Sequence, residues 1–307
     1  MANASTALTT VSTTLDANLL AGQCSPSTVA MYQRDTRAYS AWCSLAGIAP
    51  TEATSLARWR TYLVQDTTNS PNTINRMLSA VKRIMREAAA QGYTTNEIAG
   101  QFDHVDGVRR VAMKDRTRQH NRTRISPQDM RRIVDAPDTS TLVGLRDVAL
   151  LATLASTGAR IASIASLTIG QIQQQGKGYV VMLMGKNESE FRPVPLTGEA
   201  YKAIMAWIDK RPIASQFVFT SFSGRGNRLT AEAMSTVSAW RTVQHYADAV
   251  GLQHVKPHDF RRFVGTQLAA KKGVHVAQKV LGHKDARTTL QNYVLSELAE
   301  DVTEGLY

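Results

Sequence analysis

The stretch Lys256-Pro257-His258-Asp259-Phe260-Arg261-Arg262 carries the clearest local pattern in this 307-residue chain. Pro257 suits the first turn of a helix, because its φ is already helical and its missing N–H has no partner to lose there. A helix that begins here places His258 and Arg261 three residues apart, on one face of its first turn. The dipole of such a helix favours negative charge at this end, so the stretch predicts a site that holds an anion.

Two short motifs flank this helix in the sequence. In Leu281-Gly282-His283 the glycine suits the end of a helix and places the histidine in the following turn, and Tyr293 comes ten residues later. Upstream, Thr157-Gly158-Ala159-Arg160 stands where an apolar helix predicted over 144–156 ends. Each motif by itself has an ordinary structural explanation, because short motif matches are only hypotheses.

The segment between these motifs predicts a β-hairpin. Tyr179–Met184 and Phe191–Leu196 are rich in Val and Leu and flank the polar turn 185–190, in which Lys186 is the only lysine. Around the hairpin, helical periodicity predicts helices over 127–135, 144–156, 199–209, 230–250, 258–271, 275–281 and 286–293. The back of the chain is therefore a mixed domain that is mainly helical.

The first hundred residues predict an all-helical domain. Apolar residues repeat at helical spacing in several stripes, of which the third runs from Ile74 to Met85. The pairs Ser25-Pro26 and Ser70-Pro71 mark helix starts, and Ser126-Pro127 marks another at the start of the back domain. Serine caps the free amides of a first turn, and proline suits the first helical position.

Composition and charge indicate a two-domain globular protein with an anionic partner. Hydrophobic residues make up 43 % of the chain and charged residues 20 %, and the net charge is +11. The charge is uneven: residues 1–108 are neutral, 109–124 carry +6, 125–293 carry +9, and 294–307 carry −4. Nucleic acid is the first candidate partner and a membrane surface the second.

The basic stretch lies where a linker is expected, because residues 103–124 lack apolar periodicity. Its charge has two explanations, simple solvation or a strap across a phosphate backbone, and the basic domain that follows favours the strap. The helix of the third stripe, from Ile74 to Met85, likewise presents cations near one face, and a helix near 230–248 is a candidate for base reading. The candidate DNA contacts are Arg76, Lys82, Arg83, Arg86, Arg109, Arg110, Lys114, Arg116, Arg118, Arg241 and Gln244.

The ends and the cysteines argue against export. Cys24 and Cys43 are the only cysteines, so neither a disulfide framework nor a zinc site is expected. Residues 1–22 lack the basic start of a secretory signal and predict a disordered tail. The longest apolar run, Val148–Ala155, is far shorter than the roughly 20 residues that cross a bilayer. A cytoplasmic protein is expected.

The motifs together form one ordered set of chemically active side chains: Arg160, Lys186, His258, Arg261, His283 and Tyr293. This set, in this order, resembles the tyrosine recombinase or phage-type integrase family. The stretch Leu145–Ile172 looks most like the Cre branch, whereas Leu281-Gly282-His283 and Thr288-Thr289 look more like the Xer and phage-integrase branches.

The resemblance implies an α+β fold, mainly helical with a small β-sheet, whose two domains form a C-shaped clamp on DNA. It implies a helical core-binding, SAM-like domain over 23–105, a basic linker over 106–125 and a catalytic domain over 126–293. It also implies that the tail 294–307 docks on a neighbouring subunit, in a homotetramer that holds two double-stranded DNA sites in the nucleoid.

By the same resemblance, Tyr293 attacks the scissile phosphate and forms a 3′-phosphotyrosyl bond. His258 acts as its general base, since neutral tyrosine is a poor nucleophile. Lys186 protonates the leaving 5′-oxygen.

The remaining residues of the set hold the phosphate. Arg160 and Arg261 bind the non-bridging oxygens, because guanidinium forks match phosphate geometry and stay charged at any working pH. His283 donates a hydrogen bond to the phosphate. Because the covalent bond conserves the energy of the broken phosphodiester, the scheme requires no ATP, metal or other cofactor.

Two departures from the family pattern stand out. Ser163 occupies the position three residues after the first arginine, where the family usually has an acid, and the spacing from His283 to Tyr293 is one residue longer than expected. These departures favour one alternative, an inactive DNA-binding accessory protein of the same fold. A second alternative is a related enzyme, a telomere resolvase or a topoisomerase that uses the same tyrosine chemistry. Tyr307 is the only later tyrosine, so Tyr293 remains the candidate nucleophile.

Overall fold

The computed structural model describes residues 14–116, 124–185, 190–223 and 228–282. The chain divides into two compact units, Met1–His120 and Asn121–Tyr307. In the described part of the chain, no helix is long and apolar enough to cross a membrane.

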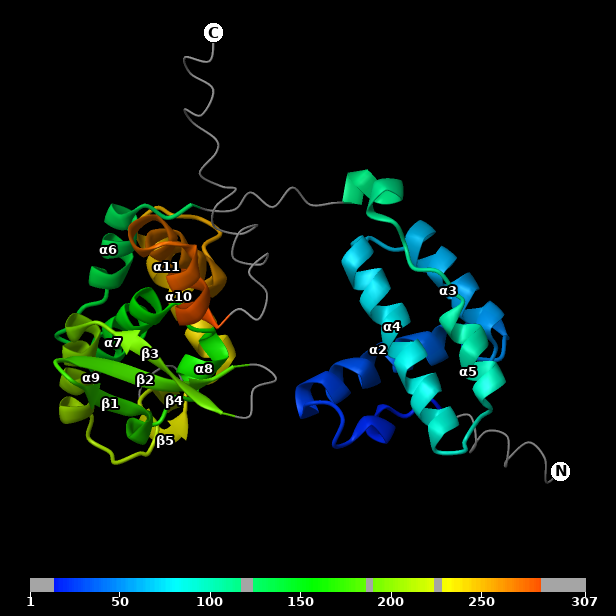
Figure 1. Cartoon of the computed structure of the whole chain (residues 1–307), viewed down its shortest axis with the longest axis horizontal. Coiled ribbons are helices and arrows are strands. Elements are labelled where there is room, and N and C mark those ends of the chain that lie inside the picture. The colour runs from blue at the N-terminus through cyan, green and yellow to red at the C-terminus, as the bar shows by residue number, and fades with distance from the viewer. Residues whose placement is uncertain (1–13, 117–123, 186–189, 224–227, 283–307) are drawn as a thin grey trace, which may run out of the picture. The chain divides into compact units, whose positions relative to one another are not determined.

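The first unit is all-helical where it is described, as its sequence predicts (Figure 1). Its elements are η1 (Ala17–Leu20), α2 (Pro26–Ala46), α3 (Ala53–Gln65), α4 (Pro71–Ala90), α5 (Asn96–Asp103) and the 3₁₀ segment η2 (Arg110–Arg116). The Ser-Pro pairs mark helix starts as predicted: the hydroxyls of Ser25 and Ser70 accept hydrogen bonds from the backbone amides of Thr28 and Thr73. Aromatic residues anchor the core, and the rings of Tyr39 and Trp59 lie 5.0 Å apart.

The prediction of a disordered tail over 1–22 is wrong from residue 14 onward. Ala17 and Leu20 of η1 are fully buried against Ile84 of α4, and the backbone amide of Ala17 donates a 2.8 Å hydrogen bond to Gln33. Two or three apolar residues are too few to show periodicity, so only the partner helix reveals that they are buried.

The first part of the predicted linker also packs on the first unit. Met113 of η2 is buried with the core of this unit, and the backbone amide of Val108 donates a 2.7 Å hydrogen bond to Asn75. Arg116 donates a 2.5 Å hydrogen bond to the carbonyl of Thr67. Residues 106–116 therefore belong to the first unit. The sequence did not show this, because the segment packs on the unit through single residues, which produce no apolar periodicity.

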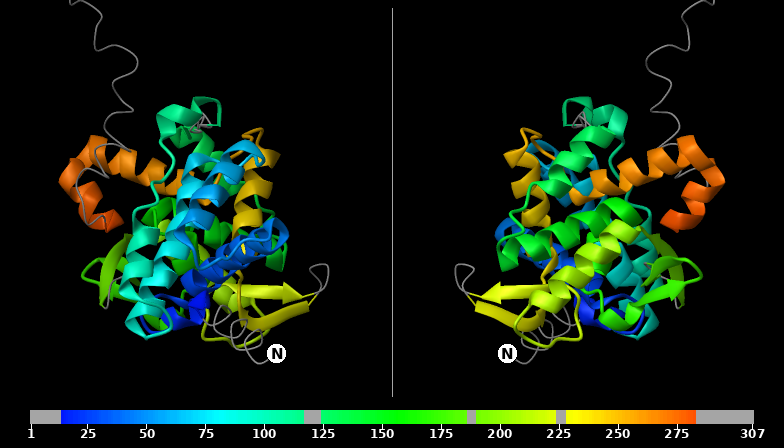
Figure 2. Two further views of the ribbon diagram at one scale, coloured as in Figure 1. Left: turned by 90° about the vertical axis from the view of Figure 1, so that its right-hand side faces the viewer. Right: turned by 90° about the vertical axis from the view of Figure 1, so that its left-hand side faces the viewer.

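The second unit combines helices with two small antiparallel sheets, which confirms the predicted fold class (Figures 1 and 2). Its helices are α6 (Pro127–Asp135), α7 (Leu142–Thr157), α8 (Ile161–Ala165), η3 (Ile169–Gln171), α9 (Gly198–Lys210), α10 (Thr236–Ala249), α11 (Pro257–Lys272) and α12 (Val274–Leu281). Its strands are β1 (Ile172–Gln175), β2 (Gly178–Met184) and β3 (Phe191–Leu196), which form one sheet in that order, and β4 (Thr220–Ser223) and β5 (Arg228–Ala233), which pair separately.

The predicted hairpin is confirmed as β2 and β3, with Tyr179 opposite Leu196 and Met184 opposite Phe191. The helix predicted over 230–250 is wrong at its start, because residues up to Ala233 pair with β4 and Ser235 then caps α10. The helix predicted over 286–293 lies outside the described residues.

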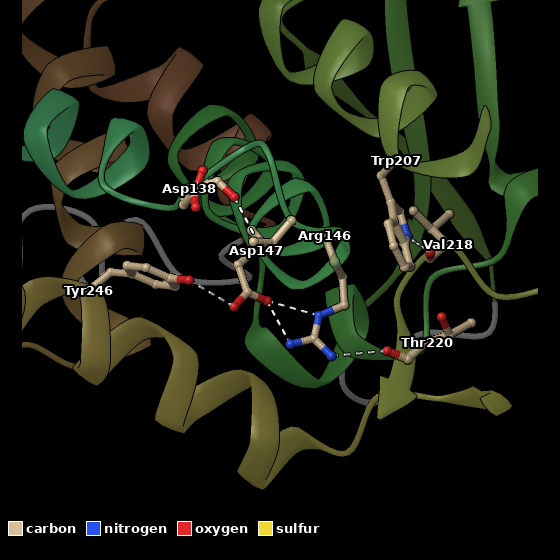
Figure 3. Close-up of polar contacts among 9 residues, drawn as sticks. Asp138, Arg146, Asp147, Trp207, Val218, Thr220 and Tyr246 are labelled. Atoms are coloured by element: carbon tan, nitrogen blue, oxygen red, sulfur yellow. Dashed lines mark hydrogen bonds and ion pairs between the residues drawn. The ribbon is translucent and has the colours of Figure 1, made fainter. Parts of the chain in front are cut away.

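Helix α7 runs through the core of the second unit, and a charged pair lies within it (Figure 3). Arg146 and Asp147 are almost fully buried, with the guanidinium Nη2 2.7 Å from the carboxylate. Arg146 also donates a 3.3 Å hydrogen bond to the carbonyl of Thr220 on β4 and lies over the ring of Phe222. Tyr246 of α10 donates a 3.2 Å hydrogen bond to the other carboxylate oxygen of Asp147, so the pair ties three elements together.

Asp147→Ala is expected to lower the free energy of unfolding of the second unit by about 3–5 kcal/mol, because it leaves the buried Arg146 charge unpaired. Tyr246→Phe removes one hydrogen bond from the same carboxylate and is expected to cost only about 1 kcal/mol. Urea denaturation of the three proteins measures both values. Equal losses in the two variants would contradict the assignment of the larger effect to the unpaired charge.

Candidate functional site

The site starts from the first turn of α11. Pro257 occupies this turn, and Asp259 accepts a 2.9 Å hydrogen bond from the backbone amide of Lys256. The other carboxylate oxygen of Asp259 lies 3.1 Å from Arg262. The helix therefore begins where the proline predicts, and Asp259 fixes its first turn through contacts within the same short stretch.

Arg261 joins the ends of three helices. Its side chain is buried, with 3 % of its surface exposed, and donates hydrogen bonds of 2.9 Å to the carbonyl of Gly158 and 2.6 Å to that of Leu281. Gly158 ends α7 with φ +59°, and a Cβ there would lie 2.9 Å from Val264 and Leu281. Glycine is thus required for its conformation and for the close approach of α11 and α12.

Arg160 and His258 lie close to Arg261. Arg160 directly precedes α8, three residues after the last residue of α7, and the side chains of Arg160 and His258 are both exposed to solvent. The pKa of His258 lies below its ordinary value: neighbouring atoms that partly desolvate the ring are the main cause, followed by the charges of Arg262, Arg261 and Arg160. The structure therefore brings together the three described members of the predicted catalytic set, where α7 ends and α11 begins.

The lowered pKa keeps the His258 imidazole neutral at pH 7, the form that can accept a proton. NMR titration of the unbound protein is expected to give a His258 midpoint below 6.5, and Arg262→Gln is expected to raise it by removing a positive neighbour. Because the unfolded chain takes up this proton more readily, His258 lowers stability as the pH falls through 6.5. A midpoint above 6.5 in the unmodified protein would contradict this environment.

The other predicted catalytic residues, Lys186, His283 and Tyr293, lie outside the described residues. Lys186 follows β2 by two residues in the sequence, and His283 directly follows the last described residue, Gly282. Their catalytic roles stay predictions.

The cations predicted as DNA contacts on α4 have partners within the first unit. Arg76 pairs with Asp35, and Arg83 donates a hydrogen bond to Gln23. The remaining two reach the end of α5, since Lys82 donates a hydrogen bond to the carbonyl of Val105 and Arg86 lies 3.4 Å from Asp103. These contacts hold the helices of the unit together and leave the DNA role of the four residues a prediction.

The other candidate contacts differ in their surroundings. Arg110 donates hydrogen bonds of 3.1 and 3.3 Å to Asn72, whereas Arg109, Lys114 and Arg241 are exposed. Gln244 is half-buried on α10, and Arg118 lies outside the described residues. Arg116 has the carbonyl of Thr67 as a partner.

Sequence reasoning missed three arginines that organise the second unit. Arg146 pairs with Asp147 within the core. Arg192 of β3 donates a 2.8 Å hydrogen bond to the carbonyl of Val280. Arg211 donates hydrogen bonds of 2.6 and 2.7 Å to the carbonyls of Phe217 and Ser215. One signal was available: adjacent opposite charges inside the apolar run of α7 indicate a buried pair. The partners of the other two are carbonyls, which have no sequence signature.

Two arginines and a histidine with a lowered pKa gather at adjoining helix ends, an arrangement that can bind a phosphate group. Among the described residues, no group of three His, Cys, Asp or Glu side chains could hold a metal ion. Comparison with known proteins gives the family. The model of the phage integrase family matches residues 123–299, and the model of the phage integrase N-terminal SAM-like domain matches residues 16–92.

The chain belongs to the phage integrase family. It is a site-specific tyrosine recombinase, an enzyme that cleaves and rejoins DNA strands. Among its relatives, tyrosine recombinase XerD of Neisseria meningitidis serogroup B is 30 % identical over 223 residues, which are 70 % of this chain and 69 % of that protein. Tyrosine recombinase XerC of Pelobacter propionicus is 25 % identical over 269 residues, 86 % of this chain and 83 % of that protein.

Two solved structures have the same fold. The Tn1549 transposon integrase in complex with circular intermediate DNA has a TM-score of 0.64 at 16 % identity, and the match covers 95 % of this chain and 99 % of that one. The XerH recombinase bound to its difH substrate in a post-cleavage complex has a TM-score of 0.63 at 17 % identity, with 85 % and 74 % covered.

Proposed function

We propose that the chain cleaves one DNA strand at a time through Tyr293 and exchanges strands through a four-way junction. The observation that carries this proposal is the buried Arg261, which joins the ends of α7, α11 and α12 beside Arg160 and His258. The contacts of Arg261 with α7 and α12 fix one positive charge beside Arg160 and His258, and charge held in place in this way stabilises a phosphodiester as it reacts.

Each residue has a defined part in the cleavage step. The phenolic oxygen of Tyr293 attacks the phosphorus, while its proton passes to the neutral His258. The bond from phosphorus to the 5′-oxygen breaks, and Lys186 supplies the proton that the 5′-oxygen takes up. A 3′-phosphotyrosyl bond and a free 5′-hydroxyl remain, and rejoining reverses these steps.

The phosphate is held by three donors during this step. Arg160 and Arg261 bind the non-bridging oxygens, and His283 donates a hydrogen bond to them. Arg261 is fixed by its carbonyl contacts with α7 and α12, whereas Arg160 is exposed at the start of α8. Ser163, in place of the usual acid, lies within α8, so support of Arg160 by an acid at this position is absent.

The assembly forms the second part of the proposal. The two units close as a C-shaped clamp on double-stranded DNA, and the basic stretch 109–124, whose first part packs on the first unit, forms a strap across the phosphate backbone. A homotetramer holds two sites in the nucleoid, and the acidic tail 294–307 docks on a neighbouring subunit. A solved λ integrase relative forms a tetramer bound to a Holliday junction, which supports this arrangement.

Trapping of the covalent intermediate tests the proposal. DNA fragments that bind the protein are selected, and a nick is placed close to the cleavage point, so that the short released strand diffuses away and rejoining is prevented. We expect a protein–DNA adduct that survives denaturant. A protein that binds its selected site and yields no adduct would instead be the inactive accessory protein.

Salt dependence tests the clamp separately. Each phosphate contact contributes about −0.9 to the slope of log affinity against log salt concentration. A clamp that uses most of the predicted contacts should therefore show a steep slope, and a slope near −1 would contradict it.

A further inference from the structure

Arg192 links the three-stranded sheet to the end of α12. It lies on β3 opposite Leu183 of β2, in the hairpin whose turn contains Lys186 in the sequence. Its side chain leaves the sheet and donates hydrogen bonds of 2.8 Å to the carbonyl of Val280 and 3.4 Å to that of Lys279. The last carbonyls of a helix have no partners within it and carry the negative end of its dipole, so a guanidinium suits this position.

The contact of Arg192 with the end of α12 also restricts which residue can stand at position 282. It ends α12 with φ +64°, a conformation that favours glycine. A Cβ built at this position would lie 2.6 Å from Nη2 and 2.7 Å from Cζ of Arg192. The guanidinium therefore lies directly against the glycine, and residue 282 is restricted both by its backbone conformation and by Arg192.

A second arginine holds the next carbonyl of the same turn. Arg261 of α11 binds the carbonyl of Leu281, while Arg192 binds those of Lys279 and Val280. The three successive carbonyls at the end of α12 are thus held by cations from two elements, β3 and α11. Arg261 already belongs to the proposed phosphate site, and Arg192 has no part in it.

We propose that Arg192 is a positioning residue for strand cleavage, which fixes the end of α12 and the turn at Gly282 against the β2–β3 hairpin. The inference rests on the proposed function, because Lys186 in the hairpin turn and His283 after Gly282 have catalytic roles only there. It adds a mechanical link between the two chain segments that supply these residues. A misplacement of about 1 Å at a reacting group can cost roughly 100-fold in rate.

The test compares cleavage with binding in Arg192→Gln and Arg192→Lys. At saturating protein on nicked DNA, we expect the rate of adduct formation to fall about 100-fold in the glutamine variant. The lysine variant keeps one cationic donor and is expected to recover about a tenth of the lost activity or more. The dissociation constant for DNA should stay within about twofold of wild type in both, because Arg192 binds carbonyls rather than DNA.

Arg132→Gln is the matched control. Arg132 donates a 2.9 Å hydrogen bond to the carbonyl of Val250, which caps the end of α10. The control therefore removes an arginine from another helix end, and we expect its rate of adduct formation to match wild type.

A double substitution tests the contact itself. Gly282→Ala places a methyl group against Arg192, so its loss of cleavage should be at least about fivefold smaller when Arg192 is already alanine. Gly273→Ala provides the control, because Gly273 has φ +89° with open space around its Cβ position, and its effect should be independent of residue 192.

The outcomes separate the two proposals. If wild type gives no adduct, the proposed function fails and this inference fails with it. If wild type cleaves and Arg192→Gln cleaves as fast, or loses DNA affinity as much as rate, only this inference fails. If the glutamine variant does not fold, the lysine variant and the Gly282 comparison decide, and additive losses in the double variant would overturn the inference.

Discussion

Replacement of Tyr293 by phenylalanine is expected to abolish the covalent protein–DNA adduct. The substitution removes a single oxygen atom, the one that the proposed mechanism bonds to phosphorus, and leaves the aromatic ring. Without that oxygen no other group in the scheme can form the 3′-phosphotyrosyl bond, so we expect no detectable adduct on nicked DNA and unchanged affinity for the site.

Tyr307→Phe is the matched control for this experiment. Tyr307 is the only tyrosine after Tyr293, so it is the alternative nucleophile nearest in sequence. We expect its adduct yield to equal that of wild type. If the yields are reversed, with adduct retained in Tyr293→Phe and lost in Tyr307→Phe, the longer spacing after His283 would mark a shift of the nucleophile to the end of the chain.

Arg261→Gln is expected to give the second largest effect, a fall in the cleavage rate of about 100- to 1,000-fold, as is typical when one transition-state donor is lost. The same change removes the donor that Gly158 and Leu281 share, so the second unit should also lose stability by about 1–3 kcal/mol for each carbonyl left without a partner. Cleavage at saturating protein and urea denaturation measure the two effects separately.

Arg211→Gln separates the two causes. Arg211 is also buried and also binds backbone carbonyls, those of Ser215, Phe217 and Val218, and it is not part of the predicted site. We expect a comparable loss of stability and a normal cleavage rate for each folded molecule. Equal losses of rate in the two variants would show that Arg261 acts only as a structural residue.

Local sequence signals predicted most elements of the fold. Serine caps followed by proline mark the starts of α2, α4 and α6, because capping depends on atoms only three residues away. Two segments rich in Val and Leu that flank the polar turn 185–190 predicted β2 and β3, because a hairpin is also formed by residues close together in the sequence. Where pairing depends on a distant partner, as for β5 with β4, the local pattern of residues 230–235 was misleading.

The candidate site likewise has features that depend on near neighbours and features that depend on distant ones. Arg160, His258 and Arg261 could be predicted as site residues, because each occurs in a short motif at a helix end. The carbonyl that each guanidinium binds could not be predicted, since every residue type has the same backbone carbonyl. Arg192 shows this most clearly, because its partners lie 87 and 88 residues away on another element.

By itself the sequence determined where most helices begin and that the back of the chain is mainly helical with a hairpin, and it predicted which side chains do the chemistry. Only the tertiary structure decided that residues 14–22 and 106–116 belong to the first unit, that Arg146 and Asp147 pair in the core, and that Arg192 and Arg261 share the end of α12. The physical reason is distance along the chain. Caps, turns and helical stripes are set by neighbours within a few residues, whereas burial and carbonyl contacts depend on segments that meet only when the chain is folded.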